Sequence, residues 1–354
     1  MIKVLITEDS PVVRGYLKYI FESDPEIQVV GTAEDGEKAV EMVRLHQPDV
    51  VTMDIHMPKM DGFQATRRIM ETNPVPIIIC SASWNPEEVE KTFKTMEAGA
   101  VAALEKPRGM GHPDSQESVQ ELIKTVKLMS GVRVVRRWSK GRGMRHGGEA
   151  PVVRTAEAPE GRRDIRLVAV GASTGGPLVL QTFLSGIPKN FPVPIAVVQH
   201  IAPGFLSGLG DWLTRTTGYP VHIASQGEHL QAGHAYLAPD GFQISLDKSF
   251  KTVLSGNTKE YTLCPSVSHF FKSLIPVFRE KMAGVLMTGM GRDGADELKL
   301  MKDAGAVTIA QDKETSVVHG MPGEAIKIGG AVFVLPSDKI AGKIVNLVTG
   351  HAGA

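Results

Sequence analysis

The clearest fold signal in the chain is the stretch LVAVGASTGGP, residues 167–177, in which a run of apolar residues leads into a glycine-rich turn. A second apolar segment, residues 178–184, follows the turn directly. The stretch therefore predicts a buried strand, a sharp turn and a helix, in that order. Continuous apolar strands are typical of parallel sheets that are covered by helices on both faces.

The same alternation of strands and helices is predicted in two separate parts of the chain. In the first part, helix candidates alternate with strands predicted at residues 3–7, 28–33, 50–53, 76–81 and 102–105. In the second part, further strands are predicted at residues 195–198, 284–287, 306–310 and 332–335. Because strands that alternate with helices build a parallel sheet, we expect two doubly wound α/β domains, at residues 1–128 and 165–350.

Residues 129–164 interrupt this alternation of strands and helices, because they are basic and rich in glycine and proline. We expect this segment to be a flexible linker between the two domains. Trp138 lies among its basic residues, so an arm that binds nucleic acid is an alternative. The rest of the chain has no basic surface signal, and we therefore expect no nucleic-acid partner.

Bulk composition narrows the class of protein. The 354 residues include 39 Lys and Arg against 39 Asp and Glu, so net charge gives no reason to expect an acidic membrane surface as partner. The two cysteines, Cys80 and Cys264, are far apart and form no CxxC pair, which disfavours a disulfide framework or a zinc site. No apolar stretch reaches the ~20 residues of a membrane span. We expect a cytoplasmic protein without membrane insertion.

Acidic residues follow two strands of the first domain. Glu8 and Asp9 come after the first strand, and Asp54 ends the third. Ser81 ends the fourth strand, and Lys106 follows the fifth. The carboxyl ends of parallel strands share one edge of the sheet, where clustered carboxylates favour Mg²⁺. A lysine and a hydroxyl beside the ion can contact a phosphoryl group. The alternative, solvated acids at loop starts, explains single residues better than the whole set.

This set, together with Met57-Pro58, Asp61-Gly62 and Lys106-Pro107, resembles the receiver domain of two-component response regulators. The resemblance implies a flavodoxin-like fold, a histidine kinase partner, and Asp54 as phosphoacceptor. It also implies Mg²⁺ held by Asp9, Asp54 and the backbone carbonyl of His56, with Glu8 acting through water, and Ser81 and Lys106 contacting the phosphoryl group. Receivers usually have an aromatic residue three positions before the lysine, where this chain has Ala103.

The second domain has a candidate nucleophile in its glycine-rich turn. Ser173 fits the pattern G-x-S-x-G between a strand and a helix, where a serine can project from a sharp turn. A nucleotide site is the first rival, but the pattern G-x-G-x-x-G and the P-loop lysine are absent. His200 and Asp293 follow two other predicted strands. Converging at one sheet edge, Ser173 would attack, His200 would remove its proton, and Asp293 would orient the imidazole.

The second domain resembles the catalytic domain of chemotaxis protein-glutamate methylesterases, the CheB family. The resemblance covers about residues 165–348 and is carried by residues 171–177, 199–205, 287–295 and 311–322. It implies a Rossmann-like domain with Ser173, His200 and Asp293 as catalytic residues. Met290 would serve the oxyanion site through its backbone, and Thr174 would neighbour the nucleophile.

The implied reaction is hydrolysis of γ-glutamyl methyl esters on chemoreceptor helices, with release of methanol and without a cofactor. Deamidation of specific receptor glutamines would use the same acyl-enzyme. Two alternatives stay open from the residues: a phosphorylation-regulated esterase with another substrate, and a response regulator whose second domain only binds a partner. A DNA-binding regulator is disfavoured, because the second domain alternates strands and helices and shows no helix-turn-helix.

Overall fold

A computed structural model of the chain describes residues 1–81, 86–107, 115–132, 134, 153–154, 162–202, 204–256 and 260–350. The chain divides into two compact units, Met1–Arg145 and His146–Ala354. Most of the predicted linker, with Trp138, lies outside the described residues. In the part of the chain that the structure describes, no helix has both the length and the apolar character needed to cross a membrane.

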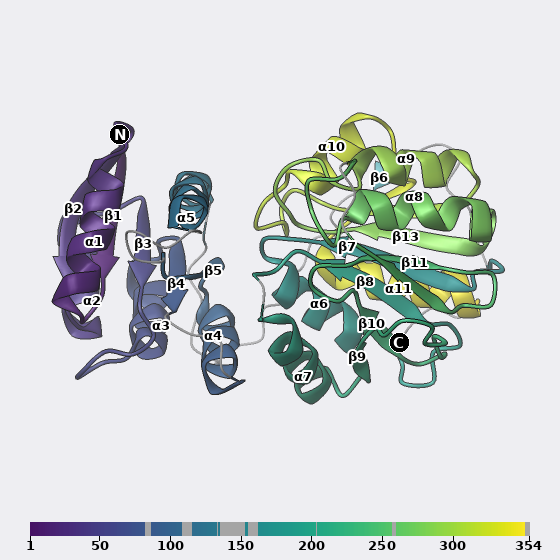
Figure 1. Cartoon of the computed structure of the whole chain (residues 1–354), viewed down its shortest axis with the longest axis horizontal. Helices are drawn as coiled ribbons and strands as arrows, with labels where there is room; N and C mark the ends of the chain where they lie inside the picture. The colour runs from purple at the N-terminus through teal and green to yellow at the C-terminus, as the bar shows by residue number, and fades with distance from the viewer. Residues whose placement is uncertain are drawn as a thin grey trace. The chain divides into compact units, whose positions relative to one another are not determined.

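The first unit is a five-stranded parallel sheet in the order β2-β1-β3-β4-β5. Its strands are β1 (Ile2–Thr7), β2 (Ile27–Ala33), β3 (Val50–Met53), β4 (Ile77–Ser81) and β5 (Ala102–Glu105). Its helices are α1 (Pro11–Glu22), α2 (Gly36–His46), α3 (Gly62–Thr72), α4 (Pro86–Ala98) and α5 (Ser115–Met129). Helices α1 and α5 share one face of the sheet, and α2, α3 and α4 share the other (Figure 1). The strand order is that of the flavodoxin-like fold, as predicted.

Local sequence explains where these helices begin. Ser10 caps α1 through a hydrogen bond from the Val13 N–H, with Pro11 at the first helical position. A reciprocal capping box of Asp61 and Gln64 starts α3. Since these caps directly follow the loops after β1 and β3, they hold the acidic residues of those loops at the sheet edge.

The second unit contains an eight-stranded sheet in the order β6-β15-β14-β13-β7-β8-β10-β9. Its strands are β6 (Val153–Arg154), β7 (Leu167–Ala172), β8 (Ile195–Gln199), β9 (Val221–Ile223), β10 (Ala235–Leu237), β13 (Met282–Leu286), β14 (Val307–Gln311) and β15 (Phe333–Leu335). Strand β6 alone is antiparallel within this sheet. A separate antiparallel pair is formed by β11 (Gln243–Leu246) and β12 (Thr252–Ser255).

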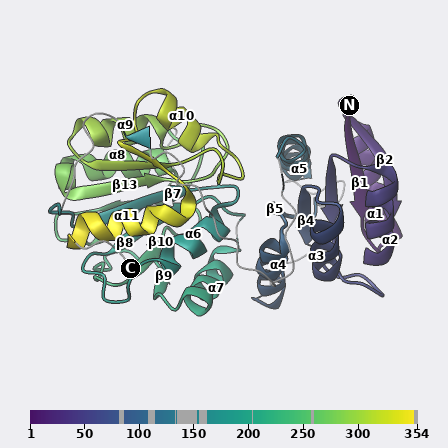
Figure 2. The same ribbon diagram turned by 180° about the vertical axis from the view of Figure 1, so that it is seen from behind.

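Helices cover both faces of this second sheet. They are α6 (Gly176–Ser185), α7 (Leu206–Thr217), α8 (Val267–Phe278), α9 (Ala295–Asp303), α10 (Met321–Lys327) and α11 (Ser337–Thr349), with a 3₁₀ turn at Arg279–Lys281. Figure 1 shows α8, α9 and α10 together, and Figure 2, from behind, shows α6, α7 and α11 together. The unit is therefore the doubly wound α/β fold that the sequence predicts.

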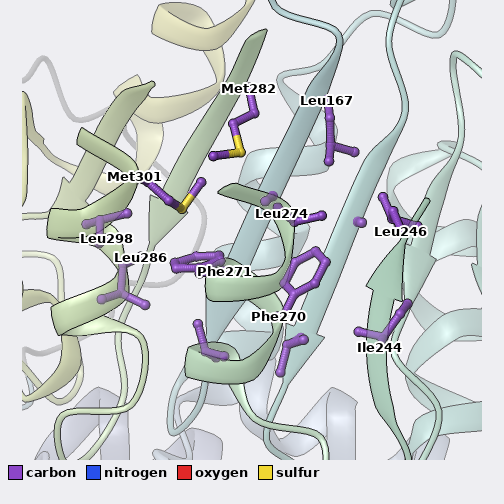
Figure 3. Packing of buried hydrophobic residues seen from close by; sticks show 14 of the residues in the cluster. Leu167, Ile244, Leu246, Phe270, Phe271, Leu274, Met282, Leu286, Leu298 and Met301 are labelled. Atoms are coloured by element: carbon purple, nitrogen blue, oxygen red, sulfur yellow. The ribbon is translucent and has the colours of Figure 1, made fainter. Parts of the chain in front are cut away.

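Helix α8 is the main apolar cover of its face. Figure 3 shows Phe270, Phe271 and Leu274 of this helix packed towards Leu167 of β7 and Met282 of β13. All five side chains are buried. Burying each of them stabilises the fold by roughly 1.5–3 kcal/mol. Val267, the first residue of α8, lies against Gly171 near the end of β7, so the helix starts at the carboxyl edge of the sheet.

The structure adds elements to those predicted from sequence. The five predicted strands of the second domain correspond to β7, β8, β13, β14 and β15, with ends that differ by up to about two residues. The short strands β9 to β12 were not among them. Strand β6 lies within the range predicted as linker, where Val153 and Arg154 pair with Val334 and Phe333 of β15.

Candidate active site and phosphorylation site

Ser173 and His200 lie side by side at the carboxyl edge of the second sheet. Strands β7 and β8 are parallel, and their register ends with Ala172 opposite Gln199. The next residue of each strand is Ser173 in one case and His200 in the other. The His200 N–H donates to the Ala172 carbonyl at 3.0 Å, which holds this register beyond the last strand pair. The two candidate catalytic residues are therefore neighbours by the geometry of the sheet.

The glycine-rich turn fixes the backbone around Ser173. The Ser173 N–H donates to the Thr288 carbonyl at 3.0 Å, and the Gly176 N–H donates to the Ser173 carbonyl at 2.8 Å. Gly175 has φ +79°, a left-handed conformation that favours glycine, and it caps the start of α6. The N-terminus of α6 therefore begins within three residues of the serine. Its partial positive charge can stabilise an oxyanion formed there.

Asp293 lies beside His200. The Nε2 atom of His200 lies 3.0 Å from Asp293 Oδ2, and the two side chains are only 15% and 14% exposed. The imidazole N–H is not aligned for a hydrogen bond, a looseness that substrate binding commonly removes in active sites. With Nε2 facing the carboxylate, Nδ1 is the nitrogen left to serve Ser173.

The first turn of α8 holds Asp293. Its carboxylate accepts hydrogen bonds from Ser266 Oγ at 2.8 Å, the Val267 N–H at 2.7 Å and the Ser268 N–H at 3.0 Å. Burial would raise the pKa of Asp293, but the close polar contact and charge of His200, with hydrogen bonds from Ser268, outweigh it and lower the pKa to about 2. Asp293 is therefore ionised at neutral pH and can support a positive imidazolium.

The loop after β13 closes the site on its other side. Gly289 lies so close to Ser173 that a Cβ atom at position 289 would meet the Ser173 Cβ at 2.8 Å and Met321 Sδ at 2.3 Å. The peptide that joins Gly289 to Met290 therefore runs beside the candidate nucleophile. Thr174 is tied to the same loop, since Thr288 Oγ1 donates to the Thr174 carbonyl at 2.9 Å. The five residues that the sequence indicated in the second domain therefore border one site: Ser173, Thr174, His200, Met290 and Asp293.

A buried glutamine that the sequence reasoning did not single out supports this location. The amide Nε2 of Gln199 donates to the carbonyls of Ser173, at 2.8 Å, and His200, at 2.7 Å. Gln199 is 3% exposed. A glutamine at the end of a buried apolar strand was the only available signal, since buried polar side chains need hydrogen-bond partners.

The first unit gathers its acidic residues at the corresponding sheet edge. Carboxylate oxygens of Glu8, Asp9 and Asp54 lie within 4.8 Å of one another. Lys106 Nζ lies 2.7 Å from Glu8 Oε2 and 2.9 Å from Asp54 Oδ2. Burial raises the pKa of both Glu8 and Asp54, an effect that Lys106 partly offsets. Ser81 is buried at the end of β4, and its carbonyl accepts the Lys106 N–H at 2.8 Å.

This donor set fits a hard divalent cation. Three carboxylates supply oxygen ligands, and those of Glu8 and Asp54 are buried. Mg²⁺ prefers such oxygen ligands together with water. The His56 N–H lies 3.4 Å from Asp54 Oδ1, so His56 belongs to the same loop. Ala103 lies in β5 opposite Ile79, half-buried, where receivers usually have an aromatic side chain.

Comparison with known proteins gives the same two parts. Residues 168–344 match the family described as CheB methylesterase, and residues 4–112 match the response regulator receiver domain. A protein-glutamate methylesterase/protein-glutamine glutaminase of Nitrosospira multiformis is 51% identical over 352 residues, covering 98% of this chain and 97% of that protein. A protein of the same description from Syntrophus aciditrophicus is 52% identical over 355 residues, covering 98% of each.

A solved structure resembles the second unit. The CheB methylesterase catalytic domain of Thermotoga maritima is 38% identical to this chain, with a TM-score of 0.50. The match covers 52% of this chain and 99% of that domain. The similarity therefore extends over the whole of a catalytic domain.

Proposed function

Because this chain belongs to the CheB methylesterase family and also contains a response regulator receiver domain, we propose that it is a chemotaxis protein-glutamate methylesterase and protein-glutamine glutaminase. Its substrates are γ-glutamyl methyl esters, and specific glutamines, on the helices of chemoreceptors. The observation that carries this function is that Ser173 and His200 follow the paired ends of β7 and β8, with Asp293 Oδ2 lying 3.0 Å from His200 Nε2.

The proposed reaction is acyl transfer through Ser173. The serine Oγ attacks the ester carbonyl carbon while His200 takes the hydroxyl proton, and Asp293 stabilises the imidazolium. The N-terminus of α6 and the backbone of Met290 face the developing oxyanion. Collapse breaks the bond to the methoxy oxygen, which leaves as methanol with the proton from His200. Water, deprotonated by His200, then releases the glutamate and restores Ser173; with a glutamine substrate the first leaving group is ammonia.

We further propose that the receiver controls this reaction after a histidine kinase donates a phosphoryl group to Asp54. Asp9, Asp54 and the His56 carbonyl would hold Mg²⁺, with Glu8 acting through water. The bound ion would neutralise charge on the phosphoryl oxygens. Lys106, which already contacts Asp54 at 2.9 Å, would pair with one phosphoryl oxygen, and the Ser81 hydroxyl with another.

The proposed domain limits are residues 1–128 for the receiver, 129–164 for the linker and 165–350 for the esterase. Helix α5 reaches Met129, and β6 adds two residues of the linker range to the esterase sheet. We also propose a cytoplasmic location. Its support is that both cysteines are free, with Cys80 buried and Cys264 half-buried, as is usual in a reducing compartment.

The test is methanol release from methylated receptor membranes by the wild type and by Ser173→Ala. Removing a covalent nucleophile should lower the rate on the order of 10⁴-fold or more while the fold stays intact. The circular dichroism spectrum and Tm of the variant check the fold. Near-normal methanol release by a folded Ser173→Ala protein would exclude the serine mechanism. Labelling of Ser173 by a serine-reactive fluorophosphonate, without any methanol release by the wild type, would indicate an esterase with another substrate.

A further inference from the structure

Two exposed apolar side chains lie in the loops around the proposed active site. Among the described residues of the second unit, the large apolar side chains that are exposed are Ile223, Phe242, Val253, Leu263 and Leu300. Phe242 is 47% exposed and Leu263 is 41% exposed. Exposed aromatic and aliphatic side chains beside a site often mark a contact surface for a partner.

The loop of Phe242 belongs to the same sheet edge as His200. It follows β10, which pairs in parallel with β8, the strand that ends just before His200. Asp240 of this loop accepts a hydrogen bond from the Gly204 N–H at 3.1 Å, and Gly204 belongs to the loop after His200. Phe242 therefore lies in a segment that borders the candidate general base.

A buried glutamine connects Phe242 and Leu263 to Ser266, which donates a hydrogen bond to Asp293. Gln243, next to Phe242, is completely buried. Its Nε2 donates to the Leu263 carbonyl at 2.7 Å, and its Oε1 accepts the Ser266 N–H at 2.9 Å. Ser266 in turn donates to Asp293 at 2.8 Å. One side chain thus fixes both apolar residues relative to the catalytic acid.

We propose that Phe242 and Leu263 form an apolar rim that recognises the substrate helix around its target residue. This rests on the proposed function, which supplies the occupant: an amphipathic α-helix that presents an uncharged glutamyl methyl ester. Residues three and four positions from that ester lie on the same face of the helix. Their apolar side chains would pack on the rim while the ester reaches Ser173.

The rim also explains release of the product. Hydrolysis converts the neutral ester into a carboxylate, which gains nothing from apolar neighbours and loses water against them. A rim of Phe242 and Leu263 therefore binds the substrate helix better than the demethylated helix. The enzyme would distinguish the methylated helix from the demethylated helix at the rim as well as at the reacting carbonyl.

The experiment compares Phe242→Ser, Leu263→Ser and the double variant in the full chain, activated with a small-molecule phosphodonor. Leu300→Ser, at 47% exposure on α9, is the matched control for loss of an exposed apolar side chain. Initial rates of methanol release are measured over a range of methylated-receptor concentrations. Truncating an anchor residue of an interface costs more than about 1 kcal/mol, so with two anchors lost we expect the double variant to raise KM by about tenfold or more. Its kcat should change by less than about twofold.

A second readout separates recognition from chemistry. The rate at which a fluorophosphonate labels Ser173 needs no receptor helix, and it should match the wild type in all three rim variants. Unchanged KM for receptors in the double variant would overturn the proposal. A parallel loss of labelling and demethylation would also overturn it, because the residues would then support the catalytic site itself. Failure of the proposed function has a different signature, since the wild type would release no methanol while still being labelled.

Discussion

Asp293 is held by more hydrogen bonds than its contact with His200 alone would require. Two backbone N–H groups and the Ser266 hydroxyl of α8 donate to its carboxylate. This network keeps the carboxylate ionised in a partly buried position, where an unpaired charge would be costly. The same bonds that orient the imidazole therefore also make Asp293 a contributor to folding stability.

That contribution has a defined pH dependence. The pKa of Asp293 falls from 3.8 to about 2 in the folded chain, so its stabilisation is complete above about pH 4 and is lost as the pH falls through 2. A shift of this size corresponds to about 2 kcal/mol. Between pH 4 and pH 2 the wild type should lose up to this amount more than Asp293→Asn. Urea unfolding of the second unit at several pH values measures the difference, and parallel stability curves would contradict the prediction.

A second prediction at this scale concerns Asp54. Asp54→Asn should accept no stable label from a phosphorylated histidine kinase, because the carboxylate that contacts Lys106 at 2.9 Å would be missing. Asp61→Asn is the matched control, since Asp61 caps α3 in the loop that follows Asp54, and asparagine can also serve as an N-cap. The control should be labelled like the wild type. Full labelling of Asp54→Asn would place the phosphoacceptor at another residue.

At the scale of elements, the first turn of α8 both caps a helix and holds the catalytic acid. Ser266 accepts the His269 N–H at 3.2 Å and donates to Asp293. Ser266→Ala should therefore lower the unfolding free energy by about 1 kcal/mol and slow fluorophosphonate labelling of Ser173. Ser10→Ala removes the cap of α1 in the receiver; it should cost similar stability and leave labelling unchanged. Equal labelling rates in the two variants would show that α8 does not position the site.

The elements that the sequence predicted are those with long apolar runs. Strands such as β7 and β13 are buried along their whole length, so their composition alone identifies them. Strands β9 and β10 have only three residues each, too few for a periodic signal. Phe242 lies in the loop after β10 and Gln243 begins β11, and neither residue was anticipated for that reason.

The residues of the candidate site also divide into those that the sequence predicted and those that it did not. Because residues after parallel strands share one edge, the sequence indicated that Ser173, His200 and Asp293 could converge. Gln199 and Ser266 act through hydrogen bonds to residues 26 and 27 positions away. Contacts over such separations depend on the fold and leave no local pattern. The roles of Met290 and His56 came from family resemblance alone.

At the scale of the whole molecule, the receiver and the esterase belong to one chain, so the receiver can regulate the activity of the esterase. In the family that the chain resembles, the unphosphorylated receiver restricts access to the esterase, and we propose the same for this chain. Fragments beginning at Pro151 or at Asp164 should therefore release methanol faster than the unphosphorylated full chain, and phosphorylation should raise the full chain towards them. The fragment from Asp164 lacks β6 and should have the lower Tm. Inhibition can be incomplete, since Ala103 removes the usual aromatic switch residue.

The measurement is methanol release per mole at matched concentration for both fragments and for the full chain with and without phosphodonor. If neither fragment is faster than the unphosphorylated full chain, the receiver does not inhibit, and its role is recruitment or activation.

Strand β6 shortens the segment that joins the receiver to the esterase. It therefore sets a lower limit on the effective concentration of one domain around the other. Since Val153 pairs with β15, the connection between the sheets runs only from Met129, the end of α5, to Val153. Fully extended, that length of chain reaches at most about 80 Å. One receiver within such a radius corresponds to an effective concentration on the order of 1 mM. An affinity far too weak to hold two separate proteins together in a cell would therefore still suffice for the receiver to act on its own esterase, and cutting the chain between these residues would make that control depend on dilution.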